Sequence, residues 1–328
     1  MVIVTEEQIT QPTEKFLAYR EKLNKREAAG KREDSLNVEY EKGLIAKSCF
    51  IELNGVVHHY HDSGPGSTGE TVLLVHGWDC WWMWWHHIIR FLNERGIRTI
   101  AYDLKGHGWS DNDPRNDYSI DSFAENLEAL VDKLKLEKFH IAAFSFGPFI
   151  ALHYAKQRPE KILSMAFFNF GYLENNRFVE KMAPATLNFT FNNLLRKITW
   201  WLPAYVFARL VLSRNTVLFH DVQIGFESLA LCAPEAIEQS TSQITSMEVT
   251  ESLVGFVEAL QVPVLFAAGD GDSIMTPENT KKLAGYCRKG IFVNVPACGH
   301  LITLELPETA GGLIFEHIKH CMPENVSF

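Results

Sequence analysis

One stretch decides the fold: Phe139-His140-Ile141-Ala142-Ala143-Phe144-Ser145-Phe146-Gly147-Pro148-Phe149-Ile150-Ala151-Leu152. It predicts a short apolar strand that ends at a serine and continues at once as a helix, which is the layout of a nucleophile elbow. So sharp a turn requires small residues two positions before and two after the serine, and Ala143 and Gly147 meet this need. Pro148 falls in the first helical turn, where its missing N–H costs little. The hydroxyl of Ser145 is therefore expected at the positive end of a helix, where an oxyanion can be stabilised.

Length and composition indicate a folded, acidic protein. The chain has 328 residues, enough for one large domain with an insertion or for two ordinary domains. Apolar residues make up 46% and charged residues 22%, which is typical of soluble globular proteins. The formal charge of -9 argues against nucleic-acid binding, which favours a basic face. The six cysteines are scattered, and no basic segment followed by an apolar run is visible near Met1. We therefore expect free thiols, no secretory signal and a cytoplasmic location.

Residues 1–48 are rich in Lys, Arg and Glu and are predicted to form a charged N-terminal helical extension. Pro12 marks a place where a helix could begin, and Gly30 and Asp34 mark places where it could end. We favour a partly disordered extension or a strut packed on the core over a dimerisation or docking arm. The oligomeric state stays open.

A hairpin is predicted after the extension, because Asn54-Gly55 joins two alternating runs at residues 49–53 and 56–61. The second run holds three histidines, His58, His59 and His61. Neighbours on a strand face opposite sides, and no carboxylate or cysteine follows at ligand spacing. We therefore predict neither a metal nor a cofactor.

Strands then alternate with helices along most of the chain. Apolar runs typical of buried parallel strands occur at residues 71–75, 98–103, 139–144, 162–169, 262–269 and 291–295. Helical periodicity occurs between and after them, at residues 84–94, 120–136, 277–287 and 313–320. This rhythm predicts an α/β fold, with a mostly parallel sheet of the eight-stranded type and helices on both faces.

The alternation breaks at residues 172–255, where no clear strand is found. Helices are expected there at residues 179–182, 192–202, 204–213 and 234–242. We predict that this segment is a helical cap over a core formed by residues 49–171 and 256–328. No apolar run reaches the roughly 18 to 20 residues that a membrane span needs.

A serine at an elbow needs a histidine to take its proton and a carboxylate to orient that histidine. Both are sought in loops after later strands, because the sites of α/β proteins lie at the carboxyl edge of the sheet. Asp270 and Asp272 follow the strand that ends at Gly269, and His300 follows the strand that ends at Val295. The chain order Ser, Asp, His is the one expected for an elbow serine.

With these residues in place, the chain resembles the α/β-hydrolase superfamily in its capped form, over about residues 49 to 328. The motifs that carry the resemblance are His76-Gly77-Trp78, Asp103-Leu104-Lys105-Gly106-His107-Gly108-Trp109-Ser110, the elbow, Gly269-Asp270-Gly271-Asp272 with Pro277, and Cys298-Gly299-His300. Ala143 departs from the family pattern, which has glycine at that position.

The resemblance implies a role for each member of a catalytic triad. Ser145 is implied to be the nucleophile. Asp272 is implied to be the acid, because the family's Gly-x-x-Asp pattern selects it over Asp270. His300 is implied to be the base, since the family uses the turn that contains His107 structurally.

The same resemblance implies an oxyanion hole formed by the backbone N–H groups of Phe146 and Trp78. Haloalkane dehalogenases and epoxide hydrolases of similar fold place an aspartate at the elbow, whereas the serine here implies acyl chemistry. We therefore predict a serine carboxylic-ester hydrolase that works through an acyl-enzyme. Three alternatives stay open: acyl transfer, hydrolysis of a carbon–carbon bond with the same triad, and a non-catalytic ligand receptor on this fold.

An apolar pocket is predicted beside the serine. Five tryptophans lie between Trp78 and Trp85, of which Trp84 or Trp85 above all is expected to pack under the sheet as core. Substrate contacts are predicted for His76, Gly77, Phe144, Trp200 and Trp201. Further aromatic residues of the cap are Phe189, Phe191, Tyr205 and Phe207. Such a lining suits a small hydrophobic ester, lipid or lactone. The run Thr199-Trp200-Trp201-Leu202-Pro203 adds the hypothesis that the cap contacts a membrane surface.

Overall fold

The computed structural model describes residues 10–172, 177–197, 206, 209 and 212–322. Its strands are β1 Ser48–Leu53, β2 Val56–Asp62, β3 Thr71–Val75, β4 Arg98–Tyr102, β5 Phe139–Phe144, β6 Ile162–Phe168, β7 Val264–Gly269 and β8 Gly290–Val295. In this part of the chain they form one eight-stranded sheet in the order β1-β2-β4-β3-β5-β6-β7-β8. β2 pairs antiparallel with β1 and β4, and all pairs from β4 to β8 are parallel, which confirms the predicted mostly parallel sheet.

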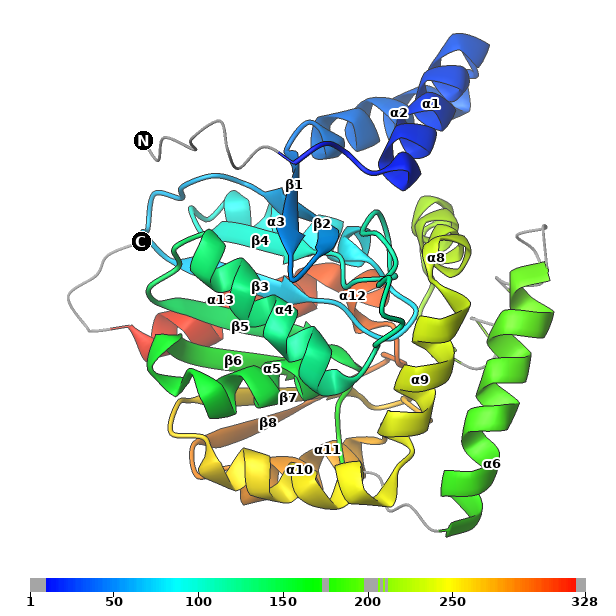
Figure 1. The fold of residues 1–328 in the computed structure, drawn as a ribbon. Coiled ribbons are helices and arrows are strands. Elements are labelled where there is room, and N and C mark those ends of the chain that lie inside the picture. The colour runs from blue at the N-terminus through cyan, green and yellow to red at the C-terminus, as the bar shows by residue number, and fades with distance from the viewer. Residues whose placement is uncertain (1–9, 173–176, 198–205, 207–208, 210–211, 323–328) are drawn as a thin grey trace.

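The helices are α1 Glu14–Ala29, α2 Arg32–Ile45, α3 His86–Asn93, α4 Ile120–Lys133, α5 Gly147–Gln157, α6 Arg177–Asn188, α8 Phe219–Leu231, α9 Pro234–Ile244, α10 Met247–Ala259, α11 Pro277–Tyr286, α12 Ile302–Glu305 and α13 Pro307–Cys321. Short 3-10 or π segments are η2 Trp82–Trp85, η3 Pro159–Lys161, η4 Phe189–Leu194 and η5 Leu195–Lys197. Helices lie on both faces of the sheet (Figure 1), as the alternating pattern predicts.

The central strand β3 is buried on both faces of the sheet. Leu73 and Val75 belong to one buried cluster with residues of α4 and α5, whereas Val72 and Leu74 belong to a second cluster with residues of α3 and α13. Successive side chains of a strand point to opposite faces, so one apolar run serves two layers. This is why the run is continuous rather than alternating in the sequence.

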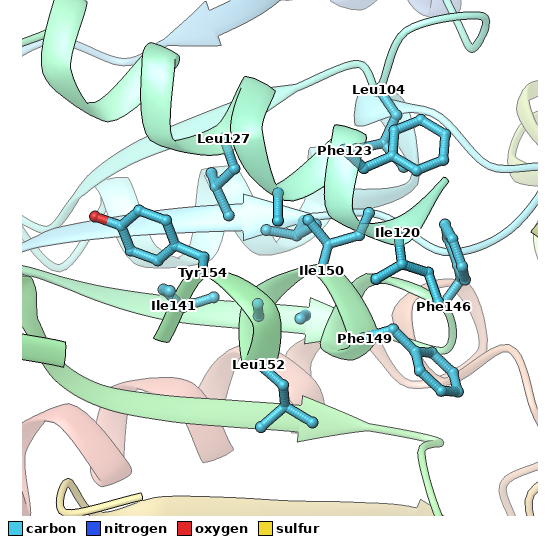
Figure 2. Close-up of a cluster of buried hydrophobic side chains, with 14 of the residues drawn as sticks. Leu104, Ile120, Phe123, Leu127, Ile141, Phe146, Phe149, Ile150, Leu152 and Tyr154 are labelled. Atoms are coloured by element: carbon cyan, nitrogen blue, oxygen red, sulfur yellow. The ribbon is translucent and has the colours of Figure 1, made fainter. Parts of the chain in front are cut away.

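Helices α4 and α5 pack on each other over β5, and the start of α5 is fixed by this packing. Figure 2 shows Leu127 of α4, Ile150 of α5 and Ile141 of β5 within one cluster of apolar side chains. Phe146 and Phe149 lie together at the end of this cluster, with ring centroids 6.0 Å apart. The residues around the elbow are therefore held from below by a close-packed interior, which resists shifts of the turn.

The N-terminal extension forms two helices that lie side by side (Figure 1). Thr13 caps the start of α1 by accepting from the backbone N–H of Phe16, and Gly30 ends α1 with a left-handed φ of +61°. The predicted stop at Asp34 is wrong, because Asp34 lies inside α2, where it binds the guanidinium of Arg26. α1 is a strut rather than a free arm, because Phe16 and Tyr19 are buried against the tryptophan-rich part of the core.

The segment between β6 and β7 contains α6, α8, α9 and α10 (Figure 1). The helix expected at residues 179–182 is the longer α6, and the one expected at residues 234–242 is α9. α8 was not expected, and α10 crosses the predicted core boundary at residue 256 and contacts α5 and α11 of the core. Of the helix expected at residues 192–202, residues 192–197 form the end of η4 and all of η5, and the rest lies outside the described residues. Most of the helix expected at residues 204–213 also lies outside them. None of the helices in the described part is long and apolar enough to cross a membrane.

Candidate active site

The predicted elbow is present, and its backbone is strained at the serine. Ser145 lies between β5 and α5 with a left-handed φ of +54°, and its N–H donates to the carbonyl of Phe168 at 2.9 Å. A Cβ on Gly147 would lie 2.5 Å from the carbonyl oxygen of Val75 in β3. Only glycine therefore lets α5 begin this close to the sheet, which explains the small residue two positions after the serine.

The structure brings Ser145, Asp272 and His300 together at the carboxyl edge of the sheet. Nε2 of His300 lies 3.1 Å from Oγ of Ser145, and Nδ1 of His300 lies 2.8 Å from Oδ2 of Asp272. Asp272 comes from the loop after β7, and His300 from the loop between β8 and α12. This chain of contacts lets an imidazole take the serine proton while a carboxylate stabilises the resulting positive charge.

Asp272 is buried, but it is surrounded by donors. Its Oδ1 accepts from the backbone N–H groups of Ile274 and Met275 at 2.8 and 3.0 Å. Burial alone would raise the pKa of this carboxyl. The charge and hydrogen bond of His300, together with hydrogen bonds from Asn169 and Met275, outweigh burial and hold the pKa of Asp272 below its ordinary value. Asp272 is thus ionised, as a partner that orients a histidine must be.

The two rival residues lie elsewhere. Asp270 is exposed, and its Oδ1 accepts from the backbone N–H of Cys298 at 3.3 Å. His107 is fully buried, with Nδ1 3.1 Å from the carbonyl oxygen of Lys105, and burial lowers the pKa of its imidazole to about 3. Within the described residues, only Asp272 and His300 of these four candidates join the chain of contacts to the serine.

Asn169 is a site residue that sequence reasoning missed. It follows β6 with a left-handed φ of +50°, and its Nδ2 donates to Oδ2 of Asp272 at 2.7 Å and to the carbonyl of Gly299 at 3.1 Å. It therefore ties the acid of the triad to the loop that carries His300. A signal was present, since Asn169 is a polar residue directly after a buried strand, at the same sheet edge as the triad.

The predicted oxyanion residues lie at the serine. A Cβ on Gly77 would lie 2.8 Å from the ring of Phe144 and 3.1 Å from the carbonyl oxygen of Phe144, so the loop after β3 packs directly on the elbow. Trp78 and Phe146 line the same cavity as Ser145. The structure thus places both residues beside the cavity that opens on Ser145.

An apolar cavity of about 490 Å³ opens on Ser145 and His300. Its size is within the range of small-molecule sites. Its aromatic wall consists of Trp78, Trp84, Phe144, Phe146, Phe149, Phe191 and Phe226. The helix α8 forms another part of the wall through Asp221, Val222, Gly225, Phe226, Ser228 and Leu229. The cavity is therefore lined by residues of the predicted core and of the segment predicted to be a cap.

The tryptophan-rich run is divided between core and cavity. Trp81, Trp82 and Trp85 are fully buried, and Trp81 and Trp82 pack against Trp109 with ring centroids 5.3 and 5.5 Å apart. Trp84 is also buried, yet it lines the cavity with its ring centroid 6.0 Å from that of Phe144. The expected core role therefore fits Trp85, whereas Trp84 serves both the core and the cavity.

Two residues predicted to contact the substrate, His76 and Gly77, lie outside the described wall of the cavity. Nδ1 of His76 lies 2.8 Å from the carbonyl oxygen of Gly77, and its Nε2 accepts from the backbone N–H of Leu104 at 3.0 Å. The ring of His76 therefore connects two loops. Phe144, by contrast, lies in the wall with its ring centroid 5.4 Å from that of His300.

The predicted aromatic residues of the cap have different outcomes. Phe191 lines the cavity and packs against Trp78 with ring centroids 4.4 Å apart, whereas Phe189 is 64% exposed. The other four lie outside the described residues, namely Trp200, Trp201, Tyr205 and Phe207.

Asp79 is a second residue that sequence reasoning missed. It lines the cavity next to Trp78, is buried, and adopts a left-handed φ of +53°. Its Oδ1 has no hydrogen-bond partner among the described residues. Burial raises the pKa of this carboxyl to about 7. The nearby charge of Arg196 and a hydrogen bond with Cys232 lower the pKa, but their effect is smaller than that of burial. Asp79 therefore brings a titratable carboxyl to a wall that is otherwise mainly apolar.

Fold and site together define the class of protein. Residues 70–307 match the family described as the alpha/beta hydrolase fold, and the chain belongs to that family. Its sequence is 23% identical over 295 residues to the AB hydrolase superfamily protein YfhM of Bacillus subtilis, an alignment that covers 84% of this chain and 98% of that protein.

Other relatives carry different activities in their names. The chain is 30% identical over 127 residues to Epoxide hydrolase 3 of Siraitia grosvenorii, which covers 38% of this chain and 39% of that protein. A solved structure of a thermophilic esterase from Thermogutta terrifontis has a TM-score of 0.69 at 21% identity, with 84% of this chain and 99% of that chain covered. The comparisons support a hydrolase of the α/β family, and its relatives include proteins named for esters and for epoxides.

Proposed function

We propose that this protein is a serine hydrolase that cleaves a hydrophobic carboxylic ester, lipid or lactone through an acyl-enzyme. The observation that carries the proposal is the chain of contacts from Ser145 through His300 to Asp272, which ends at an apolar cavity. A nucleophile, its base and the carboxylate that orients the base stand in the order that acyl transfer requires.

The geometry supports a two-step mechanism. Nε2 of His300 accepts the proton of Ser145 as Oγ attacks the carbonyl carbon of the substrate. Asp272 stabilises the imidazolium, and His300 then donates that proton to the departing alcohol oxygen. A water molecule, activated by the same imidazole, attacks the acyl-enzyme and releases the acid.

Backbone N–H groups of Phe146 and Trp78 are proposed to hold the oxyanion of each tetrahedral intermediate. Their location at the cavity, on the loops that flank the serine, supports this role. A donor of this kind contributes roughly 3 to 4 kcal/mol to transition-state stabilisation. The donors belong to the backbone, so side-chain replacement at either position tests packing rather than the hydrogen bond.

The wall of the cavity favours an apolar acyl or alcohol group. Seven aromatic side chains contribute to it, and burial of apolar surface stabilises a ligand by about 25 cal/mol per Å². The epoxide hydrolase relative suggests ring opening as another reaction. However, enzymes of that kind in this fold use a carboxylate at the elbow, and this chain has Ser145. Attack on a carbonyl is therefore the reaction that we favour.

A chain-length series of nitrophenyl esters, from acetate to laurate, tests the proposal. We expect kcat/KM to rise with chain length until the cavity is filled, and Ser145→Ala to lower turnover by about 10⁴-fold or more. Added alcohols that divert product from acid to ester would identify an acyltransferase. Tight ester binding by well-folded protein without turnover would instead contradict hydrolysis and favour a ligand receptor.

A further inference from the structure

A cluster of histidines lies at the contact between α3 and α8. Nε2 of His86 lies 3.0 Å from Oδ1 of Asp221, and Nε2 of His87 lies 3.0 Å from Oδ2 of the same carboxylate. The rings of the two histidines are 3.8 Å apart between centroids. The three candidate ligand atoms, one per residue, lie within 4.8 Å of one another. Two imidazoles and a carboxylate thus converge on one point in the interior.

A second layer from α2 orients these groups. The hydroxyl of Tyr40 lies 2.9 Å from Nδ1 of His86, the ring nitrogen that faces away from Asp221. His220, which precedes Asp221 on α8, places Nε2 2.9 Å from Oε1 of the buried Glu41. The Nδ1 of His220 lies 3.9 Å from Oδ1 of Asp221. Partners on the outer nitrogen of a histidine are the usual support of histidine ligands to a metal, and they fix which nitrogen faces the ion.

We propose that His86, His87 and Asp221 form a zinc site that fastens α8 to α3. Two imidazole nitrogens with one carboxylate are a usual zinc ligand set, and the fourth position falls to water or to Nδ1 of His220. On binding, the ring proton of each ligating nitrogen moves to the other ring nitrogen, so Nδ1 of His86 becomes the donor to Tyr40. The ion sits in the wall rather than at the serine, because Asp221 lines the cavity while its partners lie on the core helix.

Zinc binding by the full-length protein tests this site. After treatment with a chelator, the protein is titrated with Zn²⁺ alone by calorimetry, and its thermal unfolding is compared with Zn²⁺ and with EDTA. We expect one tight equivalent of zinc per chain and a higher Tm with zinc, because an ion that binds only the folded state stabilises it. Asp221→Asn and His87→Gln should each weaken binding at least 100-fold, and Tyr40→Phe by about 10- to 100-fold.

The matched control is His153→Gln, since His153 lies on α5 and pairs with Asp121 instead. This variant should bind zinc as the wild type does. His87 is the safer test if Asp221→Asn fails to fold, because its side chain is 15% exposed and lies at the edge of the cluster. The proposal is overturned if the wild type shows no zinc-dependent Tm shift. It is equally overturned if His87→Gln retains the affinity of the wild type, since zinc is then held by other histidines or cysteines.

Discussion

Ser145 and Asn169 both adopt left-handed backbone conformations, with φ of +54° and +50°, at the ends of neighbouring strands. Such conformations cost on the order of 1 kcal/mol or more for residues other than glycine, and they persist where the surroundings enforce them. Here the enforcement is visible, because the N–H of Ser145 binds the carbonyl of Phe168 and the N–H of Asn169 binds that of Ala267. The strain turns both side chains towards His300 and Asp272.

At the scale of the residue, we predict that the stability of the protein depends on the protonation of Asp79. Its pKa is raised from an ordinary value of 3.8 to about 7 in the folded protein, so folding favours the protonated form. The stability that this proton contributes is complete below about pH 4 and is lost as the pH rises through about 7. When the pH rises from 5 to 8, the free energy of unfolding of Asp79→Asn should therefore increase by about 3 kcal/mol relative to that of the wild type.

Urea unfolding at those two pH values measures the effect of Asp79→Asn. Asp270→Asn is the control, because Asp270 is an exposed carboxylate of the same sheet edge. Equal responses of the two variants to pH would show that Asp79 is ionised in the folded protein at pH 5, against the burial argument.

The residues of the triad were predicted from the sequence, whereas their supporting residues were not. Ser145, Asp272 and His300 each follow a recognisable strand in a fixed order, which is a local signal. Asn169 acts through Asp272, 103 positions away, and His86 meets Asp221 across 135 positions. Contacts at such separations depend on the folded arrangement, so residue type and spacing alone did not reveal them.

At the scale of elements, the contact between β3 and the start of α5 positions the nucleophile. Gly147 is the closest point of this contact, with its added Cβ placed 2.5 Å from a backbone oxygen that belongs to a central strand. Because the added Cβ would meet a backbone oxygen and not a flexible side chain, the overlap could be relieved only by a movement of α5 itself. The helix also carries Phe149 and Ile150 into the interior, and its shift would disturb that packing as well.

Gly147→Ala should therefore destabilise the protein by about 1 to 3 kcal/mol and reduce turnover, since overpacking a close contact has this cost. The matched control is Gly285→Ala on α11, where an added Cβ meets no described atom within 4 Å. Gly285→Ala should leave the free energy of unfolding unchanged or raise it by up to about 1 kcal/mol, because alanine has a higher helix propensity than glycine. Chemical denaturation and ester turnover measure both effects. If the two variants behave alike, the contact between α5 and β3 does not set the elbow.

The sequence pattern predicts elements well where their burial leaves a clear pattern of apolar residues. The parallel strands are continuous apolar runs, because both of their faces are covered. α8 escaped prediction because its buried face is not uniformly apolar: it holds Asp221 and Ser228 beside Ile224. Only the last two residues of η2 fall within the helix expected at residues 84–94, most of which is observed as α3.

At the scale of the whole molecule, the N-terminal extension connects the core with the helix that lines the cavity. Phe16 of α1 packs against Phe50 and Trp109 with ring centroids 5.0 Å from each. Lys15 donates to the carbonyl of Ser110 in the core at 2.8 Å and to that of Leu231 at the end of α8 at 3.3 Å. The extension therefore belongs to the folded unit, although its charged composition resembles that of a solvated arm.

Phe16→Ala should lower the free energy of unfolding by about 3 kcal/mol, because it opens a cavity in a buried aromatic cluster. Leu17→Ala is the control on the same helix. Because Leu17 is 41% exposed, its replacement should lower the free energy of unfolding by less than about 1 kcal/mol. Urea titration followed by tryptophan fluorescence compares the two. Equal midpoints would mean that α1 does not contribute to the stability of the core.

The central claim is that Ser145 is a nucleophile activated by His300. Incubation with a fluorophosphonate, followed by intact-mass measurement and peptide mapping, tests it most directly. The account predicts one phosphonyl adduct per chain, located on Ser145, no adduct on Ser145→Ala, and a strong loss of the labelling rate on His300→Ala. Well-folded wild-type protein that remains unlabelled, or that is labelled at another residue, would contradict it.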